Sequence, residues 1–313
     1  MSAPSGRSPS PMTRRIIDIA GEPLALSLCG ARLSMRTEAG QQVDVPIAEI
    51  ESVLVSHPRA TLSVQSLAEL AAAGVSAVIC DATHRPTGVV LPIAEHGKIA
   101  ARFAAQAALK RPVRKKLWRQ VVRAKIRSQA VALQSLVGSD AGLAAMCNDV
   151  RSGDPTNVES QAAVRYWRRV FGDESFRRDP ALGGRNALLN YGYAVIRASV
   201  ARAICGAGLH PALGIHHHSR GNPLCLADDL MEPFRPVIDV AVARLSAETR
   251  DEIDLDRDSK RELLAAASGR VLASGERRTV FDVIERFVLG MAKVVDGESD
   301  RLWIPKLTFE VPG

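Results

Sequence analysis

The first part of the chain alternates short apolar runs with turn residues, and the remainder follows the spacing of helices. Turn residues such as Gly21-Glu22-Pro23 and Ala39-Gly40 separate the early runs, which is typical of successive β-strands. Strands are predicted at 15–19, 24–29, 31–36, 43–46, 52–56, 75–81 and 87–91, and one helix at 62–73. The pattern predicts a small, mostly β domain over residues 14–95, after a disordered Ser/Pro-rich tail at 1–13.

From residue 96 onward the apolar positions recur at helical spacing. Helices are predicted at 186–205, 251–267 and 280–292, the first of them long and mainly apolar. Residues 96–313 are therefore predicted to form an all-α domain. The whole chain is then an α+β protein with the β domain first.

Two further helix starts are marked by capping residues. Asp154-Pro155-Thr156-Asn157 forms an N-cap cluster before a helix that carries Glu159. Asn222-Pro223 has the residue types of an N-cap and a first helical position. Pro233 and Pro236 are expected to end or kink that second helix.

Composition narrows the class of protein. No aromatic residue occurs before Phe103, so the predicted β domain must fill its core with aliphatic side chains. The five cysteines show no CxxC spacing, which favours reduced thiols in a cytoplasmic protein. No apolar run approaches the length of a membrane span, and the tail lacks a signal-peptide core, so nothing argues for a membrane or for export.

The net charge of +7 is concentrated in one stretch. Between His96 and Ser139 there are eleven Lys or Arg residues and no Asp or Glu, and Pro112 is expected to break this helical segment. The eleven are Lys98, Arg102, Lys110, Arg111, Arg114, Lys115, Lys116, Arg119, Arg123, Lys125 and Arg127. Solvated helical faces normally mix charges of both signs, so this stretch favours the phosphates of a nucleic acid.

The candidate chemistry is densest between Gly214 and Pro236. Histidines at 216, 217 and 218 are followed by carboxylates at 228, 229 and 232 and by Arg220 and Arg235. Histidine and carboxylate ligands together can hold Mg²⁺ or Mn²⁺, and Zn²⁺ is also conceivable. Three residues apart on a helix, Asp229 and Glu232 would share a face and could both point at a loop histidine. The alternative is a surface loop followed by a helix with a solvated acidic face.

Glu159 provides a further carboxylate in the same half of the chain. Alone it could be an ordinary acidic residue placed favourably against a helix dipole. Together with His217 and a carboxylate at 229 or 232, it can complete an open-sided metal site that activates a hydroxyl nucleophile or stabilises a leaving oxygen. The basic surroundings suggest a phosphodiester as the reacting group. Candidates for phosphate contacts are Arg165, Arg168, Arg220 and Arg235.

These segments resemble the CRISPR-associated integrase of spacer acquisition, in the branch found in type II CRISPR systems. The resemblance is carried by Asp154-Pro155-Thr156-Asn157-Val158-Glu159 with Tyr166-Trp167, by Gly214-Ile215-His216-His217-His218, and by Asp229-Leu230-Met231-Glu232-Pro233-Phe234-Arg235-Pro236. Weaker similarity covers 75–81 and 88–92, and the whole spans roughly residues 14 to 295.

The resemblance implies a β-sandwich domain joined to an all-α catalytic domain. It also implies a homodimer that assembles around a small adaptation partner protein, and a Mg²⁺- or Mn²⁺-dependent site on Glu159, His217 and Glu232. The family's spacing favours His217 over His216 and His218. Asp229 is expected as a second ligand or as an outer-shell partner.

Some relatives place an aromatic wedge from the N-terminal domain against the end of the DNA duplex. This chain has no aromatic residue there, and His57 or an aliphatic side chain is left as the candidate replacement.

The implied reaction is insertion of a double-stranded protospacer into the CRISPR repeat. A DNA 3′-hydroxyl would attack a phosphodiester at the edge of the repeat, with His217 as a metal ligand and not a general base. One alternative is a metal-dependent nuclease that uses water on branched or linear DNA, and another is a catalytically silent DNA-binding scaffold. The full set of metal-type residues argues against the scaffold.

Overall fold

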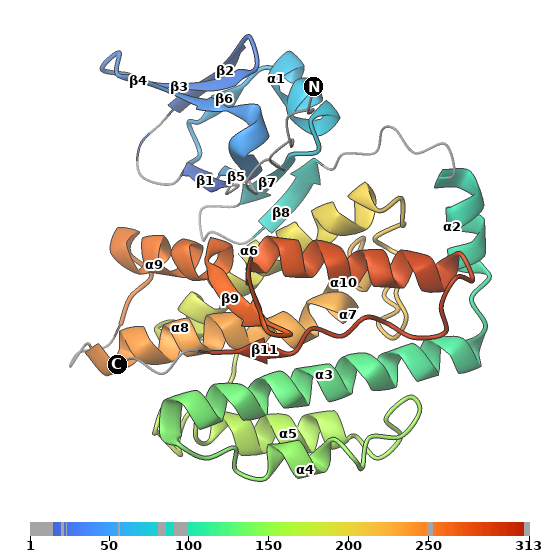
Figure 1. Ribbon diagram of the computed structural model, residues 1–313. Helices are drawn as coiled ribbons and strands as arrows, with labels where there is room; N and C mark the ends of the chain where they lie inside the picture. The colour runs from blue at the N-terminus through green and yellow to red at the C-terminus, as the bar shows by residue number, and fades with distance from the viewer. Residues whose placement is uncertain are drawn as a thin grey trace, which may run out of the picture.

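The computed structural model describes residues 15–19, 22, 24–55, 57–80, 86–90, 99–248 and 253–309 (Figure 1). The predicted tail at 1–13 and the basic residue Lys98 lie outside the described residues. Ser56, Asp81, Leu91 and residues 251–252, at the ends of predicted elements, also lie outside them.

Two four-stranded sheets make up the N-terminal part, drawn in blue to teal in Figure 1. The first, in the order β1-β5-β7-β8, comprises β1 (Arg15–Ile19), β5 (Ile50–Val55), β7 (Ser76–Cys80) and β8 (Pro86–Val90). The second, in the order β4-β3-β2-β6, comprises β4 (Gln42–Pro46), β3 (Arg32–Thr37), β2 (Leu24–Cys29) and β6 (Thr61–Leu62). The 3₁₀ turn η1 (Ile47–Glu49) precedes β5, and helix α1 (Val64–Ala72) connects β6 to β7.

An aliphatic core lies between these two sheets. Ile19 and Val53 from the first sheet, Leu26 and Leu33 from the second, and Leu70 from α1 are all at most 3% exposed. Helix α1 begins at a serine cap, because the side chain of Ser63 accepts a hydrogen bond from the backbone of Ser66 at 3.0 Å. The predicted strands and the expected aliphatic core are thus found in the structure.

Strand β5 joins the N-terminal sheets to the helical part. Val53 and Val55 belong to the core between the sheets, whereas Leu54 belongs to the helical core. Successive side chains of a strand point to opposite faces, so this strand is covered on both sides. Arg202 in the helical part also donates a hydrogen bond to the backbone carbonyl of Gly74 at 3.1 Å, which holds the two parts together.

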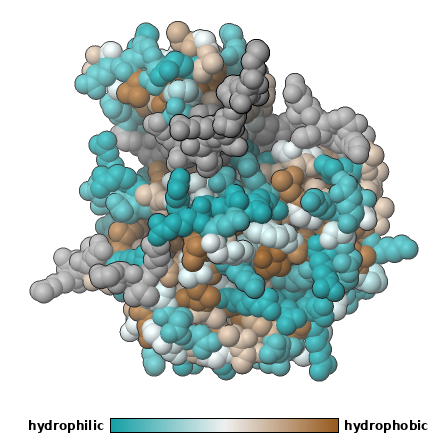
Figure 2. All heavy atoms as spheres, viewed as in Figure 1, coloured by the Kyte–Doolittle hydropathy of each residue, from teal (hydrophilic) through white to brown (hydrophobic). Residues whose placement is uncertain are grey.

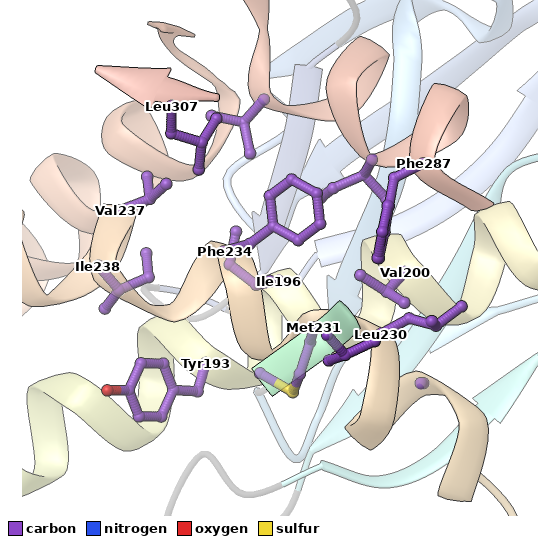
Figure 3. Close-up of a cluster of buried hydrophobic side chains, with 14 of the residues drawn as sticks. Tyr193, Ile196, Val200, Leu230, Met231, Phe234, Val237, Ile238, Phe287 and Leu307 are labelled. Atoms are coloured by element: carbon purple, nitrogen blue, oxygen red, sulfur yellow. The ribbon is translucent and has the colours of Figure 1, made fainter. Parts of the chain in front are cut away.

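The C-terminal part is mostly helical. Its helices are α2 (Ile99–Ala107), α3 (Arg111–Val137), α4 (Leu143–Met146), α5 (Val158–Trp167), α6 (Arg185–Gly206), α7 (Cys225–Met231), η2 (Glu232–Phe234), α8 (Arg235–Glu248), α9 (Arg257–Ser268) and α10 (Val280–Val295). Helix α6 is buried on nearly all sides and contacts α7, α8, α9 and α10. Figure 3 shows the core at this junction, where Ile196 and Val200 of α6 lie near Leu230 and Phe287.

A small antiparallel sheet lies within this helical part. It has the order β10-β9-β11 and comprises β9 (Arg270–Ala273), β10 (Glu276–Thr279) and β11 (Leu307–Thr308). The hairpin between β9 and β10 turns at Ser274 and Gly275, which both have positive φ (52° and 87°), as a tight two-residue hairpin requires. The α+β fold class is confirmed, and the part expected to be all-α carries this sheet in addition.

Proline placement agrees with the prediction at Pro112 and Pro233 and differs at Pro223. The basic segment is interrupted as expected, because α2 ends at Ala107 and α3 begins at Arg111, with Pro112 in its first turn, where the missing N–H has no helical partner to lose. The helix after the histidines begins at Cys225 and not at Pro223, and Asn222 accepts a hydrogen bond from the backbone of Leu224 instead. The expected kink at Pro233 is confirmed, since the 3₁₀ turn η2 separates α7 from α8.

The outer face of the molecule seen in Figure 2 is mainly hydrophilic, with hydrophobic residues scattered over both parts. In the part of the chain that the structure describes, no helix is both long enough and apolar enough to span a bilayer.

The close approach of α6 to α8 gives a test of the core. A Cβ added to Gly192 would overlap the Ile238 side chain, which is fully buried. We expect Gly192→Ala to lower the free energy of unfolding by about 1–3 kcal/mol in urea denaturation. Gly206→Ala, in the same helix but with open space around its Cβ, should be neutral or slightly stabilising. Equal effects of both substitutions would contradict this packing.

Candidate active site

Glu159 and Glu232 meet at one ammonium group, that of Lys125 in α3. The Lys125 Nζ lies 2.7 Å from Glu159 Oε1 and 2.5 Å from Glu232 Oε2. These three side chains are only 13%, 23% and 6% exposed, respectively. Residues far apart in sequence, on α3, α5 and η2, therefore bring two carboxylates to one cation.

The helix start before Glu159 is built by Asp154. Its carboxylate accepts hydrogen bonds from the backbone N–H groups of Val158 (3.0 Å) and Glu159 (2.9 Å), at the first turn of α5. Asn157, the residue in the N-cap position, has a positive φ of 53° and makes no side-chain cap. Glu159 is thus held at a helix N-terminus, where the peptide dipoles favour a negative charge.

Arg235 is the second cation on Glu232. Its Nε lies 2.8 Å from Glu232 Oε1, and its guanidinium stacks over the ring of Tyr193, 4.5 Å from the centroid. Burial alone would raise the pKa of Glu232, but the charges of Arg235 and Lys125 outweigh it and lower this pKa to about 2. Glu232 is therefore ionised at neutral pH.

The Asp229 carboxylate is hydrogen-bonded to the histidine loop. It is fully buried and accepts backbone hydrogen bonds from Ile215 (2.7 Å), His216 (3.0 Å) and His217 (3.1 Å). The His217 ring nitrogen Nδ1 lies 2.7 Å from the same carboxylate. Because both oxygens are occupied, Asp229 is placed as a partner that orients the histidine loop.

Gly214 is required at the start of this loop. A Cβ there would collide with the backbone oxygen of His217 and would lie 2.9 Å from Asp229 Oδ2. Only glycine lets the chain pass this close to the buried carboxylate.

The three histidines are held differently. His216 stacks on Trp118 with ring centroids 4.1 Å apart, and burial lowers its pKa. His217 meets Trp118 edge-on at 5.8 Å, and its hydrogen bond to Asp229 raises its pKa. His218 is exposed. With Nδ1 facing Asp229, His217 is the histidine whose Nε2 is oriented by a buried partner.

Within the described ranges, no three His, Cys, Asp or Glu side chains are already gathered into a metal-binding group. The donors nevertheless fit a divalent ion. Glu159 and Glu232 already share one cation, and Glu232 Oε2 is buried with no hydrogen bond of good geometry beyond its charge contact with Lys125. Two carboxylates and an oriented imidazole are a ligand set suited to Mn²⁺ or Mg²⁺.

Comparison with known proteins places this architecture in a family. The model of the family described as CRISPR associated protein Cas1 matches residues 19–274. The chain belongs to the Cas1 family.

Individual relatives agree with this assignment. The CRISPR-associated endonuclease Cas1 of Neisseria meningitidis serogroup C (strain 8013) is 32% identical over 288 residues, which cover 89% of this chain and 94% of that protein. Among solved structures, a casposase bound to an integration product has a TM-score of 0.79 at 21% identity and covers 95% of both chains. A Cas6-RT-Cas1–Cas2 complex has a TM-score of 0.74 at 15% identity and covers 96% of this chain and 37% of that chain. These structural matches show that the Cas1 fold is shared.

The basic stretch of this Cas1 chain divides into anchored and exposed residues. Arg102 pairs with Asp296 (Nε to Oδ1, 2.9 Å) and donates to the carbonyl of Ala207, so it ties α2 to the helical core. Lys125 is buried in the site and is not part of a surface track. Arg114 donates to the Leu109 carbonyl at 2.9 Å, and Arg123 and Arg119 are partly buried.

Other members of the stretch and the predicted arginines lie at the surface. Lys116 pairs with Asp300 at 2.9 Å, with both side chains largely exposed. The remaining exposed cations are Lys110, Arg111, Lys115 and Arg127 of the stretch, with Arg165, Arg168 and Arg220 outside it. Arg235 is the exception among the predicted phosphate contacts, because its guanidinium pairs with Glu232 and stacks over the ring of Tyr193.

A buried hydrogen-bond network around Asp239 was not predicted from the sequence. The hydroxyls of Tyr166 and Tyr193 both donate to Asp239, the former at 2.9 Å. Burial raises the pKa of Asp239 to about 7. Because Arg235 stacks on Tyr193, this network supports the arginine that holds Glu232. The available signal was a single carboxylate inside the apolar run Val237-Ile238-Asp239-Val240.

The hydrogen bonds of Asp229 predict a coupled change in stability and in histidine titration. Asp229→Asn should lower the free energy of unfolding by about 2–4 kcal/mol, because an amide cannot satisfy all four donors. The pKa of His217, followed by NMR, should fall in this variant. A histidine whose pKa is raised by folding stabilises the folded protein fully at pH values below its ordinary pKa, and this stabilisation is lost as the pH rises through the raised pKa. The difference in the free energy of unfolding between the wild type and Asp229→Asn should therefore shrink as the pH rises through these two pKa values.

The neighbouring Asp228 provides the matched control. It pairs with Arg197 at 2.6 Å and accepts from Asn222, and it contributes least among the groups that raise the pKa of His217. Asp228→Asn should leave the His217 titration nearly unchanged. If His217 keeps its raised wild-type pKa in Asp229→Asn, this carboxylate does not orient the ring.

Proposed function

We propose that this Cas1 chain is a metal-dependent DNA integrase that inserts double-stranded protospacer DNA into a CRISPR array by 3′-hydroxyl attack on a phosphodiester. The observation that carries the proposal is the convergence of Glu159 and Glu232 on one cation position. Asp229 orients the ring of His217, and the charge of Glu232 helps to raise the pKa of this histidine. The relative from Neisseria meningitidis is named an endonuclease, and the similar casposase was solved with an integration product.

Glu159, Glu232 and the Nε2 atom of His217 would hold Mg²⁺ or Mn²⁺. When bound, the ion would polarise the attacking hydroxyl and neutralise charge that develops on the phosphate. The chain's own residues prepare the ligands. Asp229 fixes the His217 ring, and Arg235 keeps Glu232 ionised at every pH near neutrality. The capping bonds of Asp154 fix the turn that carries Glu159.

The exposed cations would bind the DNA backbone. Lys110, Arg111 and Lys115 lie together at the start of α3, and Arg165, Arg168 and Arg220 are also exposed. Phosphate contacts of this kind position a duplex without reading its sequence. This arrangement supports binding of both the protospacer and the repeat.

We also propose that the chain acts as a homodimer with a small CRISPR adaptation partner. One of the similar solved structures is a Cas6-RT-Cas1–Cas2 complex, which contains a Cas2 component. In the N-terminal part, Val43 and Val64 are 60% and 83% exposed, which is apolar surface that a two-fold interface would cover.

A catalytically silent scaffold would not need the glutamate pair. Burying two carboxylates is costly unless cations pair with them, and phosphate binding gains nothing from negative groups in the site. A nuclease that uses water remains the second candidate, because it would need the same ligands and a different nucleophile.

The joining reaction separates these functions. A short duplex, a repeat-containing plasmid, Mg²⁺ or Mn²⁺ and the small partner protein should give joined product with 3′-hydroxyl ends and none with 3′-dideoxy ends. Glu159→Gln and Glu232→Gln should each reduce joining at least about a hundredfold, because a ligand that neutralises transition-state charge is lost. Glu262→Ala, on the exposed face of α9, should leave joining unchanged.

Each result has one interpretation. Plasmid cutting that proceeds equally with blocked ends and gives no joined product would establish the nuclease and exclude the integrase. Unchanged joining in both glutamine variants, with the fold verified by circular dichroism, would exclude this site as the catalytic centre.

A further inference from the structure

Lys125 occupies the position between the carboxylates of Glu159 and Glu232. We propose that the Lys125 ammonium is a built-in counter-ion, which holds the two carboxylates together without metal and must leave them when a divalent ion binds. This inference rests on the proposed function, because it concerns the same metal site. It assigns Lys125 a role in setting metal affinity.

The geometry favours exchange of one cation for another. The Lys125 Nζ lies 2.7 Å from Glu159 Oε1 and 2.5 Å from Glu232 Oε2, so the distance between these two oxygens cannot exceed the sum of the two contacts. This maximum is of the same order as the distance between two oxygen atoms bound to one Mg²⁺ ion. The ammonium and a metal ion would therefore compete for nearly the same space.

The local charge balance leads to the same conclusion. Glu159 and Glu232 carry two negative charges, and Lys125 and Arg235 carry two positive charges. A divalent ion that entered this group as it stands would meet no net negative charge. Arg235 is fixed by Glu232 Oε1 and by the ring of Tyr193, so Lys125 is the cation that can move.

The placement of Lys125 explains why a cation is needed before the metal arrives. Val121 and Val122, one turn earlier on the same face of α3, are both 0% exposed, and the Lys125 side chain itself is 13% exposed, so it leaves α3 within the helical core. Two carboxylates that face each other in such surroundings would repel strongly if left alone. Lys125 thus keeps α3, α5 and η2 together in the metal-free protein, at the expense of metal affinity.

Manganese binding to the full-length protein tests this exchange. Lys125→Met keeps an unbranched apolar side chain as long as the carbon chain of lysine and removes the charged group, whereas Lys125→Arg keeps the charge. Titration of each variant with MnCl₂ alone, by calorimetry and by the EPR signal of free Mn²⁺, gives the dissociation constant. We expect Lys125→Met to bind Mn²⁺ about tenfold or more tightly than the wild type, because a repelling unit charge is removed.

Thermal unfolding provides a second readout. Lys125→Met should melt at a lower temperature than the wild type without metal, and its melting temperature should rise more when Mn²⁺ is added. Lys125→Arg should bind Mn²⁺ no more tightly than the wild type. Lys116→Met, which removes a surface cation of the same helix paired with Asp300, should match the wild type in both measurements.

The outcomes distinguish the two proposals. If Glu159→Gln weakens Mn²⁺ binding but Lys125→Met binds Mn²⁺ no more tightly than the wild type, the counter-ion role is overturned and the metal site stands. If Glu159→Gln binds Mn²⁺ as tightly as the wild type, the metal site and the counter-ion role both fail.

A measurement on the wild type covers the case in which Lys125→Met does not fold. The ¹⁵N signal of the Lys125 ammonium, assigned by its loss in Lys125→Arg, should be protected from exchange and should shift when Mg²⁺ is added. A signal that does not respond to saturating Mg²⁺ would overturn the exchange.

Discussion

The pairing of buried charges around Lys125 is the constraint on which the helical part of this Cas1 protein depends. Charges removed from water are tolerated only when partners of opposite sign lie within contact distance. Here the partners come from separate elements, so α3, α5 and the η2 turn must meet in one register for Lys125, Glu159 and Glu232 to be satisfied. A rotation of any of them that broke these contacts would leave a buried charge unpaired. The carboxylates that could bind metal are thus positioned by the same contacts that stabilise the fold.

Two other buried aspartates hold the surroundings of this cluster. Asp229 gathers the backbone of the histidine loop and the ring of His217, and Asp239 receives the hydroxyls of Tyr166 and Tyr193. The first fixes where the imidazole lies, and the second supports the arginine that keeps Glu232 ionised. Precise positioning of ligands by a surrounding shell of hydrogen bonds is what reactive metal sites require. All of these hydrogen-bonding partners belong to this chain.

Much of the fold could be predicted from the sequence, since the N-terminal strands follow from apolar runs between turn residues. The histidines and carboxylates between 214 and 236 stand out by residue type, whereas the choice of Glu159, His217 and Glu232 depended on the family resemblance. The role of Lys125 could not be predicted from composition, because it is one of eleven lysines and arginines between residues 96 and 139. Its position four residues after Val121 and seven after Trp118, both buried, does place it on the inner face of α3.

Tertiary contacts decided the remaining differences. Arg102 and Arg235 look like surface cations in the sequence. Only the fold brings Asp296 to Arg102, and only the fold buries Arg235 and its near neighbour Glu232 against Tyr193. The sheet of β9, β10 and β11 escaped prediction because its strands are short and β10 contains two arginines. Moreover, β11 pairs with β9 across more than thirty residues of chain. Helical periodicity carries no information about such pairing.

If Glu159 and Glu232 hold a divalent ion in the position that the Lys125 ammonium occupies, anomalous diffraction from crystals soaked in Mn²⁺ will locate it. We expect one strong manganese peak between the two carboxylates and within coordination distance of His217 Nε2, with the Lys125 ammonium displaced from both. A manganese peak elsewhere, or Lys125 still bridging both glutamates at full manganese occupancy, would contradict this expectation.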